Sequence, residues 1–421
     1  MPSPVSIPLA VSKRPLNTIE THENCIGTII NTVPGECYCL ASVKGEVNVR
    51  SVTIKNGMLL SPVNGLMGER GDVILRDGRI AKVGEGLPEE GEVIDASSLY
   101  VTPGFIDIHT HVYPKSFLGL EPDVLGLERG ATTVLDAGSS GSDTYDDFKR
   151  NYIDKAQTKV FTLLNISKEG ILRGHELNDP SKIDVEACER VAREHADNIV
   201  GIKARASSSV VGEEGLRPIV VAARTAHELG LPLFVHVGNF PPALYDVLDL
   251  LEKGDGITHT YHGKPGGIVT EEGTILPQAL HARARGVRFD VGHGIESFSF
   301  KTYEKALALG FDCDTISTDL HVENYEGPVY SIAAVMSKLI SLGESFPDAV
   351  RKVTSAPAAQ FHLKGLGQLK PGMIGDVNIV SLTDSDDVVT DSTGDTISLK
   401  KKVEVIESVY SKGEDIERYR H

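Results

Sequence analysis

Two histidines one residue apart are the first residues of this chain that could carry chemistry. His109 and His111 flank Thr110 at the end of an apolar run that predicts a strand. Alternate residues of a strand point to the same face, so both imidazoles would lie on one side. Such a pair suits a first-row metal such as zinc, which binds histidine nitrogen. Two hydrogen-bonded structural histidines have the same spacing, so the pair alone does not decide between these interpretations.

Further candidate ligands stand at or near the ends of other predicted strands: Lys203, His236, His259 and Asp319. In a barrel of parallel strands, the carboxyl ends of all strands meet at one face, where catalytic residues gather. The histidines, the lysine and the aspartate are therefore expected to converge on one mouth. Together they predict a metal site there.

Lys203 and Asp319 are expected to do more than bind a metal directly. An ammonium group has three donors and no acceptor, so an unmodified lysine cannot ligate a cation. Lys203 fits the site if its neutral amine adds CO₂, because the carbamate is an anionic oxygen ligand; a salt bridge near the rim is the alternative. Asp319 could accept a proton from a metal-bound hydroxide and deliver it to a leaving group. Its structural alternative is an N-cap for the next segment.

The predicted mouth requires strands and helices that alternate along the middle of the chain. Short apolar runs predict eight strands: residues 105–109, 133–137, 160–165, 199–204, 233–237, 256–259, 287–291 and 314–318. Segments with helical spacing of apolar residues lie between them, such as residues 214–229, where Gly230 is placed to end the helix. This alternation over about 250 residues predicts an α/β fold, the (β/α)₈ TIM barrel.

Turn-rich strand patterns flank the predicted barrel on both sides. Residues 51–100 hold short β-rich stretches separated by Asn-Gly, Asp-Gly and Gly-Glu-Gly turns, which predict an antiparallel meander, and similar patterns return after Ala356. We expect an irregular N-terminal extension (1–50), with a short strand near 37–43, and a barrel (101–355). A small composite β-sandwich would be built from residues 51–100 and 356–421.

The composition excludes several classes of protein. The chain has 42 Lys and Arg against 59 Asp and Glu, a net charge of -17, which disfavours nucleic-acid and membrane partners. Five scattered cysteines indicate no disulfide framework and favour a reducing, cytoplasmic location. Cys37 and Cys39 could form half of a metal site, but no second pair completes it. The first residues lack the apolar core of a secretory signal, and a transit peptide stays open.

Several motifs together resemble the amidohydrolase superfamily. They are residues 101–111 (VTPGFIDIHTH), 201–205 (GIKAR), 317–319 and 367–376 (GQLKPGMIGD), with the histidines of predicted strands five and six. The resemblance covers roughly residues 51–382. It implies a TIM barrel with a composite β-sandwich and a site for two divalent metals, usually zinc.

The resemblance also implies how the ligands divide. One metal is held by His109, His111 and Asp319, and the other by His236 and His259. Carboxylated Lys203 and a hydroxide bridge the two metals. The hydroxide would attack a substrate carbonyl polarised by one metal, with Asp319 transferring the proton.

Within the superfamily, the motifs are most similar to those of dihydroorotase-like bacterial deacetylases. The likeness is carried by residues 107–114 (DIHTHVYP), 134–138 (VLDAG), 201–207 (GIKARAS), 259–263 (HTYHG) and 289–294 (FDVGHG). Dihydroorotases usually have an arginine just after the histidine pair, which binds the substrate carboxylate, and Val112 follows here instead. The likeness implies hydrolysis of a small acylated substrate, such as the acetyl ester of an α-hydroxy acid.

Four side chains near predicted strand ends are candidate substrate contacts: Tyr113, Arg205, His262 and His293. Arg205 could bind a carboxylate through two hydrogen bonds, with a structural ion pair as the alternative. His321 has no assigned role, and the remaining histidines are expected to be structural or solvated.

Three other functions stay open beside the ester deacetylase. They are a cyclic amidohydrolase acting on dihydroorotate or hydantoin rings, an N-acyl amino acid deacylase, and a non-catalytic scaffold. The presence of all six ligand candidates disfavours the scaffold. A homo-oligomer is also left open.

Overall fold

The computed structural model describes residues 30–33, 36–38 and 50–421, which belong to two compact units. The first unit spans Met1–Asn48, and its described part is an antiparallel strand pair, β1 (Ile30–Val33) and β2 (Glu36–Tyr38). The second unit, Val49–His421, holds all other elements. The predicted extension thus includes a strand pair, whereas Cys39 and most of the strand predicted near 37–43 lie outside the described residues.

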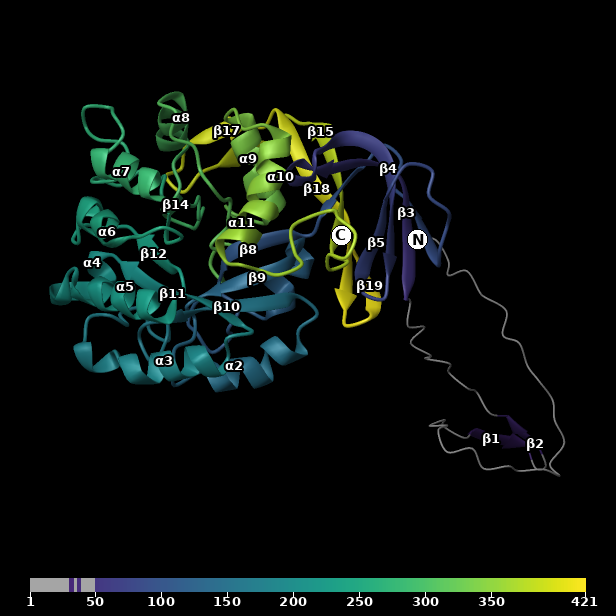
Figure 1. Ribbon diagram of the computed structural model, residues 1–421, viewed down its shortest axis with the longest axis horizontal. Coiled ribbons are helices and arrows are strands. Elements are labelled where there is room, and N and C mark those ends of the chain that lie inside the picture. The colour runs from purple at the N-terminus through teal and green to yellow at the C-terminus, as the bar shows by residue number, and fades with distance from the viewer. Residues whose placement is uncertain (1–29, 34–35, 39–49) are drawn as a thin grey trace. The chain divides into compact units, whose positions relative to one another are not determined.

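Parallel strands form the wall of the predicted barrel. Seven of them are hydrogen-bonded in the order β14-β13-β12-β11-β10-β9-β8 (Figure 1). Their bounds are β8 (Phe105–Thr110), β9 (Ala131–Ala137), β10 (Lys159–Asn165), β11 (Ile199–Ala206), β12 (Leu233–Val237), β13 (Gly256–Thr258) and β14 (Arg288–Phe289). Every residue of β8 and β9 is buried, as expected for strands covered on both faces. Seven of the eight predicted strands are confirmed.

The eighth predicted strand, residues 314–318, is not a regular strand. Its segment still joins both edges of the sheet through isolated parallel bridges, Asp290 to Thr315 and Thr110 to Leu320. Asp319 follows with a left-handed backbone (φ 55°), which interrupts a continuous ladder. The barrel is therefore closed by single bridges, and its irregular backbone lies where Asp319 enters the mouth.

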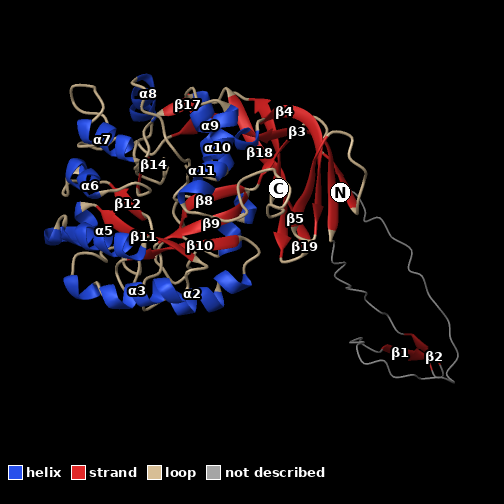
Figure 2. Ribbon diagram, in the orientation of Figure 1, coloured by secondary structure: helices blue, strands red, loops and turns tan. Residues whose placement is uncertain are grey.

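Helices alternate with the parallel strands along the chain and lie around them, and the last three, α9 to α11, lead from the barrel to β15 (Figure 2). They are α1 (Pro122–Leu125), α2 (Tyr145–Asn151), α3 (Val185–Glu194), α4 (Ser208–Val211), α5 (Arg217–Leu229), α6 (Leu244–Leu250), α7 (Pro277–Arg285), α8 (Phe300–Ala308), α9 (Ile332–Ser341), α10 (Phe346–Lys352) and α11 (Ser355–Gln360). As predicted, Gly230 ends a helix: at φ 68° it donates its N–H to the carbonyls of Ala226 and His227. No described helix is long and apolar enough to cross a membrane.

The two flanking segments meet in one eight-stranded sheet, ordered β19-β18-β15-β7-β3-β4-β5 with β6 paired to β3. Its strands are β3 (Ser51–Ser61), β4 (Leu66–Arg76), β5 (Arg79–Gly84), β6 (Glu92–Asp95), β7 (Tyr100–Pro103), β15 (Val377–Asp384), β18 (Lys401–Lys412) and β19 (Asp415–Arg420). β7 pairs with β15, so strands from before and after the barrel join, as predicted. The predicted meander is wrong beyond β5, because β6 and β7 run parallel to β3.

A small hairpin leaves this sheet between β15 and β18. Its strands are β16 (Val388–Thr390) and β17 (Thr396–Ser398), which pair only with each other. The turn of this hairpin contacts the segment after β14 at the mouth of the barrel.

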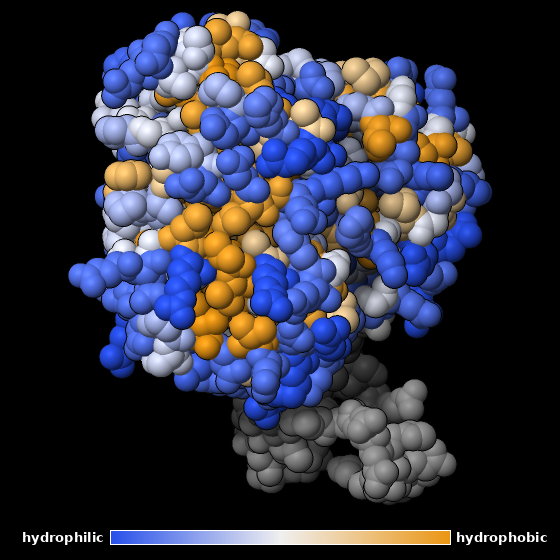
Figure 3. All heavy atoms as spheres, turned by 60° about the vertical axis from the view of Figure 1, so that its left-hand side comes forward, coloured by the Kyte–Doolittle hydropathy of each residue, from blue (hydrophilic) through white to orange (hydrophobic). Residues whose placement is uncertain are grey.

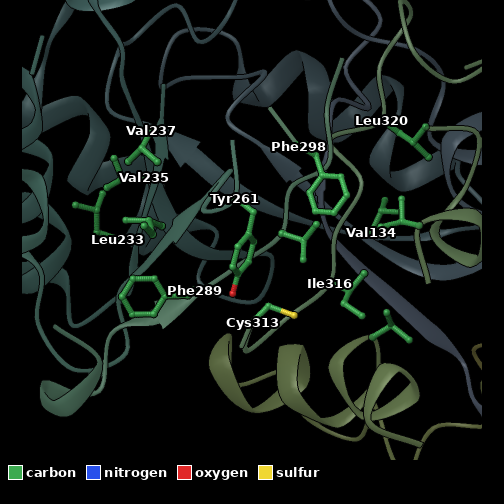
Figure 4. Packing of buried hydrophobic residues seen from close by; sticks show 14 of the residues in the cluster. Val134, Leu233, Val235, Val237, Tyr261, Phe289, Phe298, Cys313, Ile316 and Leu320 are labelled. Atoms are coloured by element: carbon green, nitrogen blue, oxygen red, sulfur yellow. The ribbon is translucent and has the colours of Figure 1, made fainter. Parts of the chain in front are cut away.

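Apolar residues fill the space around and beneath the mouth. Figure 4 shows part of the main cluster, with Val235 of β12, Phe289 of β14 and Ile316 of the irregular eighth segment. A separate cluster joins β8 to β12 with α11 and includes Phe234. The Phe234 ring lies 5.9 Å from the ring of His109, so this apolar cluster directly supports the polar site.

Candidate metal centre

The histidine pair that ends β8 lies against Asp319. Nε2 of His109 and Nε2 of His111 are 3.3 and 3.1 Å from Oδ1 of Asp319. Lys203, from β11, places Nζ 3.2 Å from Nε2 of His109. Both histidines and the lysine are buried, and the Asp319 side chain is 14% exposed. Residues far apart in the sequence thus present donor atoms to one small volume.

His259 and His236 complete the cluster. Nε2 of His259 is 3.9 Å from Oδ2 of Asp319, and its ring centre is 5.0 Å from that of His109. The rings of His236 and His259 are 4.4 Å apart. One donor atom each of His109, His259 and Asp319 lie within 4.8 Å of one another, the spacing of a metal site. The structure therefore brings together all six residues predicted as ligands.

Hydrogen bonds behind the histidines turn their Nε2 atoms toward this volume as acceptors. Nδ1 of His259 donates to the carbonyl of Gly292 at 2.6 Å, so the lone pair is on Nε2, and that buried atom has no hydrogen-bond partner among the described residues. A buried nitrogen without a partner costs free energy, and a metal would satisfy it. The nitrogen and oxygen donors suit zinc or a similar divalent ion, so the residues fit the predicted metals.

His109 is oriented by a two-step relay. Its Nδ1 lies 2.9 Å from Oγ1 of Thr258, and that hydroxyl donates to Asp290 at 2.8 Å. Because the hydroxyl proton is committed to Asp290, Nδ1 of His109 must donate, which leaves its Nε2 free as an acceptor. Asp290 also accepts from Thr315 at 2.8 Å and from Ser317 at 2.6 Å. Carboxylates that orient metal-binding histidines in this way are common at metal sites.

Backbone conformation is unusual at the two positions that matter most. His259 and Asp319 have φ values of 67° and 55°, a left-handed region that costs non-glycine residues about 1–2 kcal/mol. Two glycines make room for the site. A Cβ on Gly138 would lie 2.7 Å from Cγ of Lys203, and one on Gly294 would lie 2.7 Å from Oδ2 of Asp319.

Burial sets the ionisation of the cluster. It lowers the pKa of Lys203 to about 7 and that of His259 to about 4. Burial by itself would raise the pKa of Asp319, but the neighbouring His109 and His111 outweigh this and hold it well below its usual value. At neutral pH, His259 is therefore an uncharged imidazole and Asp319 an ionised carboxylate, the forms that bind metals.

Two predicted substrate contacts are engaged by carboxylates of the protein. The hydroxyl of Tyr113 donates to Oδ2 of Asp147 at 2.9 Å. Arg205 forms two hydrogen bonds of 2.6 Å to Glu176 and one of 3.0 Å to the carbonyl of Gly174. Arg205 thus has the bidentate geometry expected of it, but with an internal partner. Substrate contact by either residue stays a prediction.

The two predicted histidine contacts differ in their surroundings. Nδ1 of His293 donates to the carbonyl of Gly294 at 2.9 Å, and its Nε2 accepts from Lys338 at 2.9 Å. His262 accepts at Nδ1 from the backbone N–H of Lys264 at 3.2 Å and lines a pocket of about 370 Å³. Of the four predicted contacts, His262 is the one that lines this pocket.

That pocket lies beside the carboxyl ends of β11 and β12. Its walls are largely apolar and include Ala206, Val237, Leu244 and Val247. Figure 3 shows an apolar stripe flanked by hydrophilic residues on the side of the molecule toward α5, α6 and α7. Exposed apolar side chains on that side include Phe240, which lines the pocket.

Sequence reasoning missed several residues that shape the centre. Thr258 and Asp290 were not singled out, although each is a polar residue inside or next to an apolar predicted strand, which is a detectable signal. His321 had no assigned role; its Nδ1 lies 2.6 Å from the carbonyl oxygen of Asp319. Lys338 lay outside every motif.

Sequence similarity over most of the chain identifies the family of the protein. The sequence profile of the amidohydrolase family matches residues 100–414. This chain belongs to the amidohydrolase family. The family is generally dependent on two metal ions, which agrees with the six clustered donors, and the protein is a hydrolase.

The amidohydrolase has curated relatives named deacetylases. One from Enterococcus faecalis is 38% identical over 363 residues, covering 85% of this chain and 96% of the relative. One from Agrobacterium fabrum is 36% identical over 364 residues, covering 85% of this chain and 88% of the relative. Both matches span most of each protein.

Solved structures with the same fold carry other names. A crystal structure of an adenine deaminase has a TM-score of 0.83 and 37% identity, covering 88% of this chain and 99% of that one. A crystal structure of a dihydroorotase has a TM-score of 0.81 and 33% identity, with the same coverage. The reactions named differ, so the comparisons establish an amidohydrolase and leave its substrate to be argued from the site.

Proposed function

We propose that this amidohydrolase is a zinc-dependent deacetylase that hydrolyses the acetyl ester of a small α-hydroxy acid. The observation that carries the proposal is the buried donor cluster with the unpartnered Nε2 of His259. The two relatives named deacetylases, which match most of the chain, favour an acetyl group as the group released.

The donor set divides between two ions in this proposal. His109, His111 and Asp319 would hold one, and His236 and His259 the other. Lys203 would bridge them as a carbamate, formed when its neutral amine adds CO₂ through a new N–C bond and releases one proton. Lys203 is fully buried, and within the described part of the chain no carboxylate lies within salt-bridge distance of its Nζ. These surroundings favour an anionic modification that turns a cation into a ligand.

The protein groups around the ions supply the proton transfers and the binding of substrate. Two divalent ions, when bound, polarise the scissile carbonyl and make a water nucleophilic at neutral pH. Oδ1 of Asp319 faces Nε2 of His109 and His111 at 3.3 and 3.1 Å, the side where a metal would be shared with them, while Oδ2 accepts no hydrogen bond from the described residues. Oδ2 is therefore the atom that can take the proton of the attacking water and deliver it to the leaving oxygen.

The pocket beside His262 would hold the part of the substrate that does not react. Its volume of about 370 Å³ suits a small molecule, and its apolar walls favour an apolar substituent. His293 would contact the substrate only by exchanging a present partner, because both its ring nitrogens are engaged. The Tyr113 hydroxyl can still accept a hydrogen bond, and Nη1 of Arg205 donates to none of the described residues.

The test is a hydrolysis panel on the protein loaded with zinc in bicarbonate buffer. The panel holds O-acetyl α-hydroxy acids, N-acetyl amino acids, and the cyclic substrates dihydroorotate and hydantoin. Acetate release from the esters that is lost in a Lys203→Ala variant is the expected result. Preference for the N-acetyl compounds would make the protein an N-acyl amino acid deacylase.

A cyclic amidohydrolase is the second candidate, favoured by the structural likeness to a dihydroorotase. Ring opening without acetate release would establish it and refute the deacetylase. Bound zinc with no turnover of any ester in the panel would also count against the proposed substrate.

A further inference from the structure

A lysine with no role in the proposed chemistry is buried in the middle of α9. Lys338 is 1% exposed, and its Nζ donates to the carbonyl of Pro328 at 2.7 Å, the carbonyl of Thr390 at 2.8 Å and Nε2 of His293 at 2.9 Å. An ammonium has three donors, so its capacity is filled. None of the carboxylates in the described part of the chain lies within salt-bridge distance of it.

The acceptors of Lys338 belong to three separate segments. His293 lies in the loop after β14, Pro328 in the loop that follows Asp319, and Thr390 at the end of β16 in the separate β16–β17 hairpin. One side chain thus joins a loop before the irregular eighth segment and a loop after it to this hairpin.

The loop that carries His293 touches the metal centre directly. The carbonyl of Gly292 accepts from Nδ1 of His259 at 2.6 Å and so fixes the ring of a candidate ligand. The N–H of Gly294 donates to the carbonyl of Thr318 at 2.9 Å, next to Asp319. A displacement of this loop would therefore move or release both candidate ligands.

The hairpin of β16 and β17 holds the same loop from outside. The hydroxyl of Ser392 donates to the carbonyl of Gly294 at 2.9 Å, and the N–H of Ser392 donates to the carbonyl of Phe298 at 3.0 Å. Asp391 accepts from the N–H of Phe300 at the start of α8, at 2.8 Å. The β16–β17 hairpin is thereby connected to the mouth of the barrel through side chains and backbone.

We propose that Lys338 is a positioning residue. Together with the β16–β17 hairpin it fixes the 292–294 loop, and this loop holds His259 and Asp319 in the positions that bind the metal and support catalysis. A buried cation without a carboxylate partner is a costly way to join segments, and an apolar side chain at such a position is often as stable or more so. A methionine at this position could not donate the three hydrogen bonds that Lys338 gives to three separate segments. The inference rests on the proposed metal centre, whereas its first test does not.

The first test measures hydrogen–deuterium exchange on the metal-free full-length chain. Lys338→Met should speed exchange in residues 290–300 and 388–398 and leave the strands of the barrel unchanged. Ser392→Ala removes the hydroxyl that contacts the carbonyls of His293 and Gly294 without touching a buried charge, and it should speed exchange in 290–300 to a smaller degree. The matched control is Ser341→Ala, also in α9. The hydroxyl oxygen of Ser341 accepts a hydrogen bond from the N–H of Lys400 at 2.9 Å, just before β18, and makes no contact with the 292–294 loop. Unchanged exchange in residues 290–300 in both Lys338→Met and Ser392→Ala would overturn the proposal.

The second test uses the zinc-loaded protein and the best substrate of the panel. Positioning residues around metal ligands typically change activity or metal affinity by about 10- to 100-fold. Lys338→Met should lower kcat by that factor with KM changed less than about twofold, and Ser341→Ala should change neither. In a His293→Phe background, the further loss on Lys338→Met should be smaller than in the wild-type protein, because one of the three contacts of Lys338 is already gone.

The two tests separate the possible failures. A full, multiplicative loss in the double variant, or a lower melting temperature with unchanged kcat, would show that Lys338 is structural only. If the wild-type protein hydrolyses nothing in the panel while exchange changes as expected, the proposed substrate fails and the positioning role stands.

Discussion

Replacing Thr258 with valine isolates the relay behind His109. Valine has nearly the shape of threonine and removes only the hydroxyl that lies 2.9 Å from Nδ1 of His109 and 2.8 Å from Asp290. Asp290 would keep two of its three hydroxyl donors, Thr315 and Ser317. The main loss therefore falls on His109, whose Nδ1–H would have no acceptor in a buried site.

The magnitude follows from that unpaired donor. Leaving one buried polar group without its partner costs about 1–3 kcal/mol. If His109 must hold this orientation to bind zinc, the cost appears as a loss of metal affinity of about 5- to 150-fold. The alternative tautomer, with the proton on Nε2, would avoid the unpaired donor but would remove the metal ligand. Both outcomes weaken zinc binding.

The zinc affinity of each variant is measured by competition with a chromogenic chelator, and the metal content of the purified protein is then determined. Thr315→Val is the matched control, because Thr315 is also buried and donates to Asp290 at 2.8 Å but has no contact with Nδ1 of His109. Thr258→Val should bind zinc at least about 5-fold more weakly than Thr315→Val. Equal affinities in the two variants would refute the relay.

Three further predictions concern ionisation, the internal ion pair and proton transfer. Burial lowers the pKa of His262 to about 4, so in the unfolded chain this residue binds more protons below about pH 6.5, and stability falls as the pH falls. In urea unfolding of the metal-free protein, His262 should account for about 2–3 kcal/mol of the stability lost between pH 7 and 4.5, so the decline should be smaller by that amount in His262→Gln; an identical decline in that variant would contradict the assignment. Glu176→Gln leaves Arg205 buried without its carboxylate and should lower the free energy of unfolding by about 3–5 kcal/mol in the same assay. A change below about 1 kcal/mol would show that this ion pair does not stabilise the fold. Asp319→Asn should keep the native circular dichroism spectrum but lower kcat about 10²- to 10⁴-fold, and full activity would exclude Oδ2 as the proton carrier.

The strands and the ligand cluster could be predicted because they leave periodic or chemical marks in the sequence. Strands such as β8 are buried on both faces and read as apolar runs, and the histidines at their ends interrupt those runs with metal-binding side chains. The irregular eighth segment has a weaker pattern, because Ile316 is the one apolar residue within 314–318, and Asp319 adopts a left-handed backbone that no local pattern predicts. The segment is therefore irregular because of the backbone conformation at the metal site, and not because its residues disfavour a strand.

The sequence could not predict which way a side chain points, and therefore not which partner it contacts. Arg205 stands in β11 close to Lys203, but it is neutralised by Glu176, which lies in a loop with no marked motif. Likewise, Lys338 is the one charged residue of the largely apolar helix α9, and only the fold shows that loops before and after Asp319 in the chain reach it. Contacts between distant loops depend on tertiary packing, which local spacing does not encode.

The pairing of β7 with β15 also places a constraint on the order of synthesis. The entire barrel, residues 104–376, lies between these two strands, so β3 to β7 leave the ribosome long before β15 exists. Until then, the edge of β7 exposes backbone groups that can pair with a strand of another chain. Nascent chains that stall within the barrel would therefore be the species most prone to associate, and the sheet can only be completed after the catalytic half of the protein has been made.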